Sequence, residues 1–140
     1  MINYLKISAL FPLILFFSFL SVSAQTKQRI VLTKARGEAG KAVAGQAKGT
    51  ISGDAFREFT FRIPKSRGVD IGLNSKTVDA PLTFDLISPN GKVLEKSIGD
   101  YLDELKAPGT YTIRVYMLKE DADIKRPAKA SFTVTVFMYV

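Results

Sequence analysis

The sequence predicts an all-β protein, with a single antiparallel β-sandwich of about eight or nine short strands in residues 25–140 and a signal peptide helix in residues 1–24. Three observations support this prediction. Apolar and polar residues alternate with period two in several segments. Short turns rich in proline, glycine and asparagine separate these segments, and no long helical period follows residue 24. The pattern indicates one domain without repeats or a linker.

The first 24 residues have the features of a secretory signal peptide. Lys6 is their only charged residue, and a mostly apolar run follows at residues 7–20. Ala24, with Val22 two positions before it, suits signal peptidase, and the run is shorter than the roughly 20 residues that a membrane-spanning helix needs. We expect cleavage near Ala24, a periplasmic or secreted protein, and no membrane contact after cleavage. An uncleaved membrane anchor is the alternative.

The composition excludes many catalytic mechanisms. The 140 residues include no cysteine, histidine or tryptophan. A disulfide, a zinc site of the usual ligands, a thiol nucleophile and an imidazole base are therefore all absent. The acidic residues do not follow the spacing of an EF-hand, and no S-x-x-K motif occurs. We expect neither an enzyme nor a protein that holds a metal or a cofactor.

Positive charge is concentrated near the start of the predicted domain. Residues 25–50 hold six basic residues against Glu38 alone, whereas basic and acidic residues nearly balance in residues 51–140. Such a stretch could face an anionic cell-wall polymer, lipid or an acidic protein cleft, or it could only keep the protein soluble. No aromatic residue interleaves it, so we do not expect a nucleic-acid partner.

The first predicted elements are a short strand at residues 29–32 and a loop at residues 35–48. The loop is predicted because Gly37, Gly40 and Gly45 punctuate an alanine- and lysine-rich segment. These glycines do not have the spacing of a phosphate-binding loop. A strand is expected to begin near Gly49.

Clear period-two alternation follows. It predicts strands at residues 59–63 and 69–73 with a turn between them. It also predicts a hairpin of residues 82–86 and 92–97, because Ser-Pro-Asn-Gly at residues 88–91 suits a tight turn.

The last elements include the clearest strands. Residues 101–105 could be a short strand or a helical turn, whereas residues 111–117 and 131–140 alternate strongly. Between these two strands, residues 119–129 hold seven charged residues in eleven positions. This segment is either a binding loop or a solvated hairpin tip.

Four segments carry a resemblance to a known family. They are residues 49–53 (GTISG), 59–64 (FTFRIP), 105–116 (LKAPGTYTIRVY) and 131–136 (SFTVTV), with the charged segment before the last. Together they resemble the periplasmic inhibitors of g-type (goose-type) lysozyme and, more loosely, the bacterial pre-peptidase C-terminal β-sandwich domains. The likeness covers the chain from about residue 32 to its end.

The resemblance implies an exported binding protein whose charged loops plug the active-site cleft of a g-type lysozyme. The inhibitor family has an aromatic residue just after the glycine that Gly53 matches, and two arginines four residues apart in the last loop. This chain has Asp54 at the first place, and Lys119 and Asp123 at the other two. The partner-binding residues that it implies are Lys119, Asp123, Lys125 and Arg126, together with Asp54 and, as aromatic anchors, Tyr101 or Tyr116.

A second hypothesis is an envelope accessory module like the pre-peptidase domains. It would bind polysaccharide, peptidoglycan or a partner protein through a sheet face or the basic stretch. Under either hypothesis we expect a monomer, because nothing in the sequence argues that its edge strands pair two copies.

Overall fold

The computed structural model describes residues 27–34, 42–120 and 124–139. In these residues the chain forms strands only, and it has no helix long and apolar enough to cross a membrane. The signal peptide predicted for residues 1–24 lies outside the described residues. The strands are β1 (Gln28–Arg29), β2 (Thr33–Lys34), β3 (Ala42–Ser52), β4 (Phe56–Ile63), β5 (Arg67–Ser75), β6 (Leu82–Ile87), β7 (Val93–Ile98), β8 (Asp100–Leu105), β9 (Gly109–Met117) and β10 (Lys129–Tyr139).

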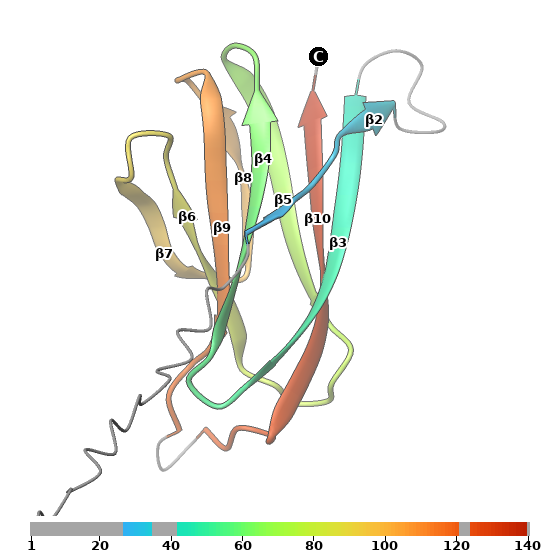
Figure 1. Ribbon diagram of the computed structural model, residues 1–140, viewed down its shortest axis with the longest axis vertical. Helices are drawn as coiled ribbons and strands as arrows, with labels where there is room; N and C mark the ends of the chain where they lie inside the picture. The colour runs from blue at the N-terminus through green and yellow to red at the C-terminus, as the bar shows by residue number, and fades with distance from the viewer. Residues whose placement is uncertain (1–26, 35–41, 121–123, 140) are drawn as a thin grey trace, which may run out of the picture.

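The strands form two five-stranded sheets that pack face to face (Figure 1). The first sheet has the order β1-β4-β9-β6-β7 and the second has the order β2-β3-β10-β5-β8. Every pairing is antiparallel except that of β1 with β4. The predicted β-sandwich is confirmed, and so is the hairpin of residues 82–97. Residues 101–105 form strand β8 and not a helical turn.

The described residues form ten strands, one or two more than expected: residues 101–105 are a strand, and the strand predicted at residues 29–32 is not one strand. β1 pairs with β4 in the first sheet, and β2 pairs with β3 in the second. Ile30, just after β1, is buried and donates its backbone N–H to the carbonyl oxygen of Thr60 over 2.7 Å. The segment therefore crosses from one sheet to the other along the side of the sandwich.

The core lies between the sheets and follows the predicted alternation. On β9, Tyr111, Ile113 and Val115 are buried, and β10 buries every second residue from Phe132 to Met138. The ring of Phe132 packs edge-on against that of Phe59, with the ring centres 5.8 Å apart. These central strands bury large side chains, which is why their pattern is strong in the sequence.

The loop predicted at residues 35–48 is wrong from residue 42 onward, where β3 begins; residues 35–41 lie outside the described part. The inward positions of β3 alternate, but most of them are glycine or alanine. A side chain at Gly45 would begin 2.4 Å from the carbonyl oxygen of Val31, and one at Gly49 would begin 2.7 Å from the ring of Phe132. The glycines therefore permit close packing inside a strand, and here they do not mark a loop.

The direction of the strands gathers three connections at one end of the sandwich, the lower end in Figure 1. These are the turn of residues 53–55, the connection of residues 76–81 and the connection from β9 to β10, of which the structure describes residues 118–120 and 124–128. The last joins β9 to β10, which belong to different sheets. The charged segment is thus a crossover between sheets and not the tip of a hairpin.

Replacing Gly49 by alanine should destabilise the protein by about 1–3 kcal/mol, because the new methyl group would overlap the buried ring of Phe132. Gly72→Ala is the matched control, since no atom lies within 4 Å of the position of its added carbon. There, alanine should leave stability unchanged or raise it by about 0.5–1 kcal/mol. Urea unfolding measures both, and equal midpoints for the two variants would contradict this packing.

Candidate functional site

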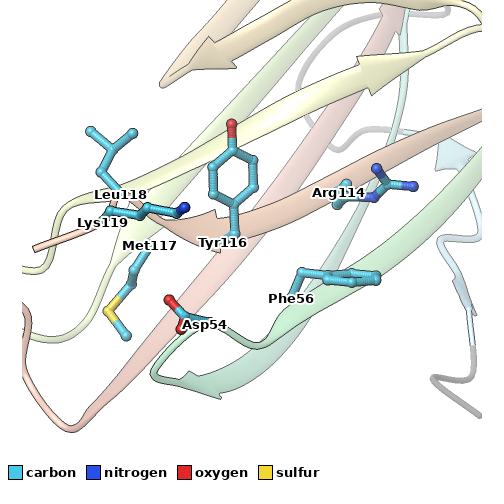
Figure 2. A pocket seen from close by; sticks show the side chains of 7 residues that line it. All are labelled: Asp54, Phe56, Arg114, Tyr116, Met117, Leu118 and Lys119. Atoms are coloured by element: carbon cyan, nitrogen blue, oxygen red, sulfur yellow. The ribbon is translucent and has the colours of Figure 1, made fainter.

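A hollow of about 640 Å³ lies on the outer side of the first sheet, close to the end that carries residues 53–55 and 118–128 (Figure 2). Three of the residues that the resemblance implies for partner binding lie in it, namely Asp54, Tyr116 and Lys119. We call this hollow the lower groove. Its lining residues are Asp54, Phe56, Arg114, Tyr116, Met117, Leu118 and Lys119.

The pairing of β4 with β9 builds one wall of the lower groove. Phe56 is the register partner of Tyr116, and Glu58 is that of Arg114, so these four side chains share the outer face. The guanidinium of Arg114 lies over the ring of Phe56, 5.1 Å from its centre. Its Nη2 atom is 3.4 Å from Oε2 of Glu58. The ion pair and the cation–π contact hold this wall in place.

Tyr116 is anchored through its hydroxyl group. The hydroxyl donates to Oδ1 of Asp85 over 2.8 Å and lies 2.6 Å from Oγ of Ser97. The backbone N–H of Ser97 donates to the same carboxylate oxygen over 2.9 Å. Burial raises the pKa of Tyr116; the hydrogen bond with Ser97 lowers it and that with Asp85 raises it. The ring is left as a wall of the groove while the hydroxyl satisfies a buried carboxylate.

Asp54 stands at the tip of a tight turn. Gly53 adopts a φ of 56°, which suits glycine at the first central position, and the N–H of Ala55 donates to the carbonyl oxygen of Ser52 over 3.1 Å. Nη1 of Arg126 donates to Oδ1 of Asp54 over 2.8 Å and to the carbonyl oxygen of Gly53 over 3.2 Å. This pair ties the crossover to the turn.

The same pair sets the electrostatics of the tip. The hydrogen bond from Arg126 lowers the pKa of Asp54, the positive charge of Arg126 adds to this, and that of Lys119 contributes further. The side chain of Arg126 is only 17% exposed. Lys119 is exposed at the rim, and neither of the two ion pairs within the described residues includes it.

The other predicted site residues lie elsewhere. Tyr101 lines a separate hollow of about 410 Å³ together with Tyr111, and burial raises its pKa. Lys125 is exposed in the crossover. Asp123 lies outside the described residues. The structure thus gathers Asp54, Tyr116, Lys119 and Arg126 at one end and leaves Tyr101 out.

Sequence reasoning missed four residues of the lower groove: Phe56, Arg114, Met117 and Leu118. A signal was present for two of them. Arg114 shares the predicted outward face of a strand with Tyr116, and Phe56 lies three residues before the strand predicted at residues 59–63. Large aromatic and arginine side chains on an outward face are typical of binding surfaces.

The lining of the lower groove is mixed in chemistry. It combines two aromatic rings, the side chains of one methionine and one leucine, and an exposed ammonium group, a composition typical of binding surfaces. Among residues 27–34, 42–120 and 124–139, no three His, Cys, Asp or Glu side chains lie close enough together to hold a metal ion.

No family model matches this sequence, and no curated protein matches it either. Solved structures do resemble it in fold. One is PliG of Aeromonas hydrophila, a periplasmic inhibitor of g-type lysozyme, at 16% identity and a TM-score of 0.58, covering 81% of this chain and 97% of that one. Another is the pre-peptidase C-terminal domain of a Bacillus anthracis collagenase, at 18% identity and 0.53, covering 80% and 95%.

This chain shares the fold of both. The two families that the sequence resembles are thus both found among its structural neighbours, and the likeness extends over nearly the whole length of each. At this level of identity the likeness establishes the fold, and fold does not imply function.

Tyr116→Phe should lower the free energy of unfolding by about 1–3 kcal/mol, because it removes a hydrogen bond to the buried carboxylate of Asp85. Tyr139→Phe is the control, since its side chain is exposed near the end of β10. We expect the control to change stability by less than about 0.5 kcal/mol. Denaturant unfolding compares them, and an equal loss in both would argue against the anchoring role of Tyr116.

Arg126→Ala should raise the pKa of Asp54 toward the ordinary value of about 3.9, because it removes the hydrogen bond and the charge that lower it. In the unaltered protein, any stabilisation from this pair is fully present when the pH is above the ordinary pKa of an aspartate. It is lost as the pH falls through the lowered pKa of Asp54. A carbon-detected NMR titration of the Asp54 carboxyl group measures the shift. Lys125→Ala, in the same crossover, should leave this titration nearly unchanged; a similar rise there would contradict the pairing.

Proposed function

We propose that this chain is an exported, non-enzymatic protein that binds a g-type lysozyme and inhibits it. The end of the sandwich with the turn of residues 53–55 and the crossover of residues 118–128 would enter the catalytic cleft. One observation carries the proposal. These two segments, which the resemblance implies for binding, meet through the pair of Asp54 and Arg126, 72 residues apart in sequence, beside one groove.

The charge at this end suits such a target. Lysozyme catalysis depends on a carboxylic acid in the cleft. Lys119 presents an exposed ammonium group at the rim of the lower groove, and a carboxylate of the partner would attract it. Lysine offers a compact charge on a flexible stem, without the planar fork of arginine. We therefore expect a point contact to the target acid and not a two-point clamp.

Aromatic contact would come from within the groove. Asp54 occupies the place where the inhibitor family has an aromatic residue, and here it holds Arg126. Phe56 and Tyr116 lie close by and expose their rings to the same hollow. Aromatic side chains in such hollows frequently dominate binding energy. We assign the anchoring role to this pair of rings, with Tyr116 fixed by Asp85.

The proposed compartment is the periplasm, or the outside of the cell. Two features support it: the signal-peptide pattern of residues 1–24, and the fold shared with an inhibitor described as periplasmic.

The proposal is tested by titrating the purified protein into a goose-type and a chicken-type lysozyme and following the lysis of a cell-wall suspension. We expect near-stoichiometric inhibition of the goose-type enzyme alone. Lys119→Glu should weaken it more than tenfold, because it replaces attraction to the cleft by repulsion. Lys106→Glu makes the same change of charge just before β9, at the opposite end of the strand, and should alter inhibition less than about twofold.

A second candidate is the envelope accessory module. Phe137 and Tyr139 of β10 are exposed on the outer face of the second sheet, and Leu102 is exposed on β8 of the same face. Exposed apolar groups of this kind mark interaction surfaces. If neither lysozyme is inhibited and the protein is retained on purified cell walls, this candidate replaces the first.

A further inference from the structure

A second hollow, of about 470 Å³, lies where β3 and β10 run side by side, apart from the lower groove. Its lining is cationic and rich in hydroxyl groups. We call it the basic pocket. Its polar and charged lining residues are Lys48, Thr50, Arg57, Lys76, Ser131 and Thr133.

The register of the second sheet brings four of these side chains together. Lys48 pairs with Thr133, and Thr50 pairs with Ser131. The hydroxyl oxygens of Thr50 and Ser131 lie 3.0 Å apart in a hydrogen bond. Because these positions alternate with the inward-facing Gly49 and Phe132, the four side chains share the outer face of the sheet.

The segment that carries Lys76 is held against β10. The N–H of Lys76 donates to the carbonyl oxygen of Ser131 over 2.7 Å, and the N–H of Ser131 donates to Oγ1 of Thr77 over 2.9 Å. The hydroxyl of Ser75 closes the turn by donating to the carbonyl oxygen of Thr77 over 2.6 Å. Arg57 reaches the pocket from β4, with its guanidinium 5.8 Å from the centre of the Phe59 ring. The backbone around the pocket is therefore fixed in advance.

Among the residues that the structure describes, the basic pocket contains positive charges without a negative one. No carboxylate is among its lining residues, and neither ion pair of the described residues includes Lys48, Arg57 or Lys76. The hollow that contains Tyr101 is a useful contrast. It also has two lysines, Lys92 and Lys106, but they are balanced by Glu95 and Glu104. Three cations around one hollow without a carboxylate create a positive potential that an anion would satisfy.

We infer that the basic pocket binds a phosphate monoester carried on a small polar group such as a sugar. A phosphate monoester has nearly two negative charges and three acceptor oxygens, which match three cations, whereas a carboxylate has one charge. The hydroxyl groups of Thr50, Ser131 and Thr133 can donate or accept, as sugar hydroxyls require. The volume is well beyond that of a phosphate ion, so it leaves room for the carrier.

The inference is tested by NMR titration of the purified protein with glucose 6-phosphate, inorganic phosphate and glucose at low ionic strength. We expect glucose 6-phosphate to shift the amide signals of residues 48–50, 57, 76 and 131–133. Binding should weaken as salt is added, because the contacts are ionic. Glucose should cause no shifts, and inorganic phosphate should bind the same residues at least threefold more weakly.

A pair of double variants provides the control. Lys48→Gln with Lys76→Gln should weaken glucose 6-phosphate binding at least tenfold. Lys92→Gln with Lys106→Gln removes the same charge from the hollow that Tyr101 lines. This double variant should change the affinity for glucose 6-phosphate less than twofold. Equal effects of the two double variants, or shifts scattered over lysines throughout the protein, would overturn the site. If inorganic phosphate binds as tightly as glucose 6-phosphate, the pocket does not recognise the sugar. If glucose binds as tightly as glucose 6-phosphate, the pocket does not recognise the phosphate group. None of these readouts depends on lysozyme inhibition.

Discussion

The pairing of β3 with β10 builds one wall of the basic pocket and brings the crossover beside the lower groove. Every residue of β10 pairs with β3, from Lys129 opposite Ser52 to Tyr139 opposite Ala42. The first of these pairs brings the crossover next to the turn of residues 53–55, so that Arg126 reaches Asp54. The pairs that follow build the hydroxyl face of the basic pocket. A slip of one residue would exchange the inward and outward sides of β10, which would turn Phe132 outward and the threonines toward the core.

How far the fold can be predicted depends on which side chains fill the core. β9 and β10 bury large residues at every second position, so simple alternation reveals them. β3 has the same alternation, but glycine faces inward where Val31 and Phe132 approach, and period-two hydrophobicity disappears. In residues 28–34 the sequence suggests one strand where the structure has two. The segment has the composition of one strand but changes sheets after two residues, a decision made by tertiary packing and not by local preference.

The sequence indicates which segments form the site, but it does not indicate how their side chains are arranged in space. The resemblance indicates the residues after Gly53 and the last charged connection, and the structure brings both to one end. It gives no sign that Arg126 pairs with Asp54, because that contact depends on the register of strands far apart in sequence. The basic pocket was hidden for the same reason. Lys48 is one of several lysines in a basic stretch, and only the sheet places it near Arg57 and Lys76.

The pair of Asp54 and Arg126 changes how the departure from the inhibitor family is understood. An aspartate in place of an aromatic residue gives up an aromatic contact, yet it also ties Arg126 of the crossover to a turn in which Gly53 adopts a positive φ. A tied segment has less conformational entropy to lose on binding, so weaker individual contacts can still give useful affinity. Tyr116, held by Asp85 and Ser97, contributes a ring that is rigid in the same sense. The lower groove thus combines fixed aromatic walls with one flexible cation at the rim, Lys119. Under the proposed function, such a surface would gain affinity from being pre-organised, and the exposed ammonium group of Lys119 would favour an acidic partner.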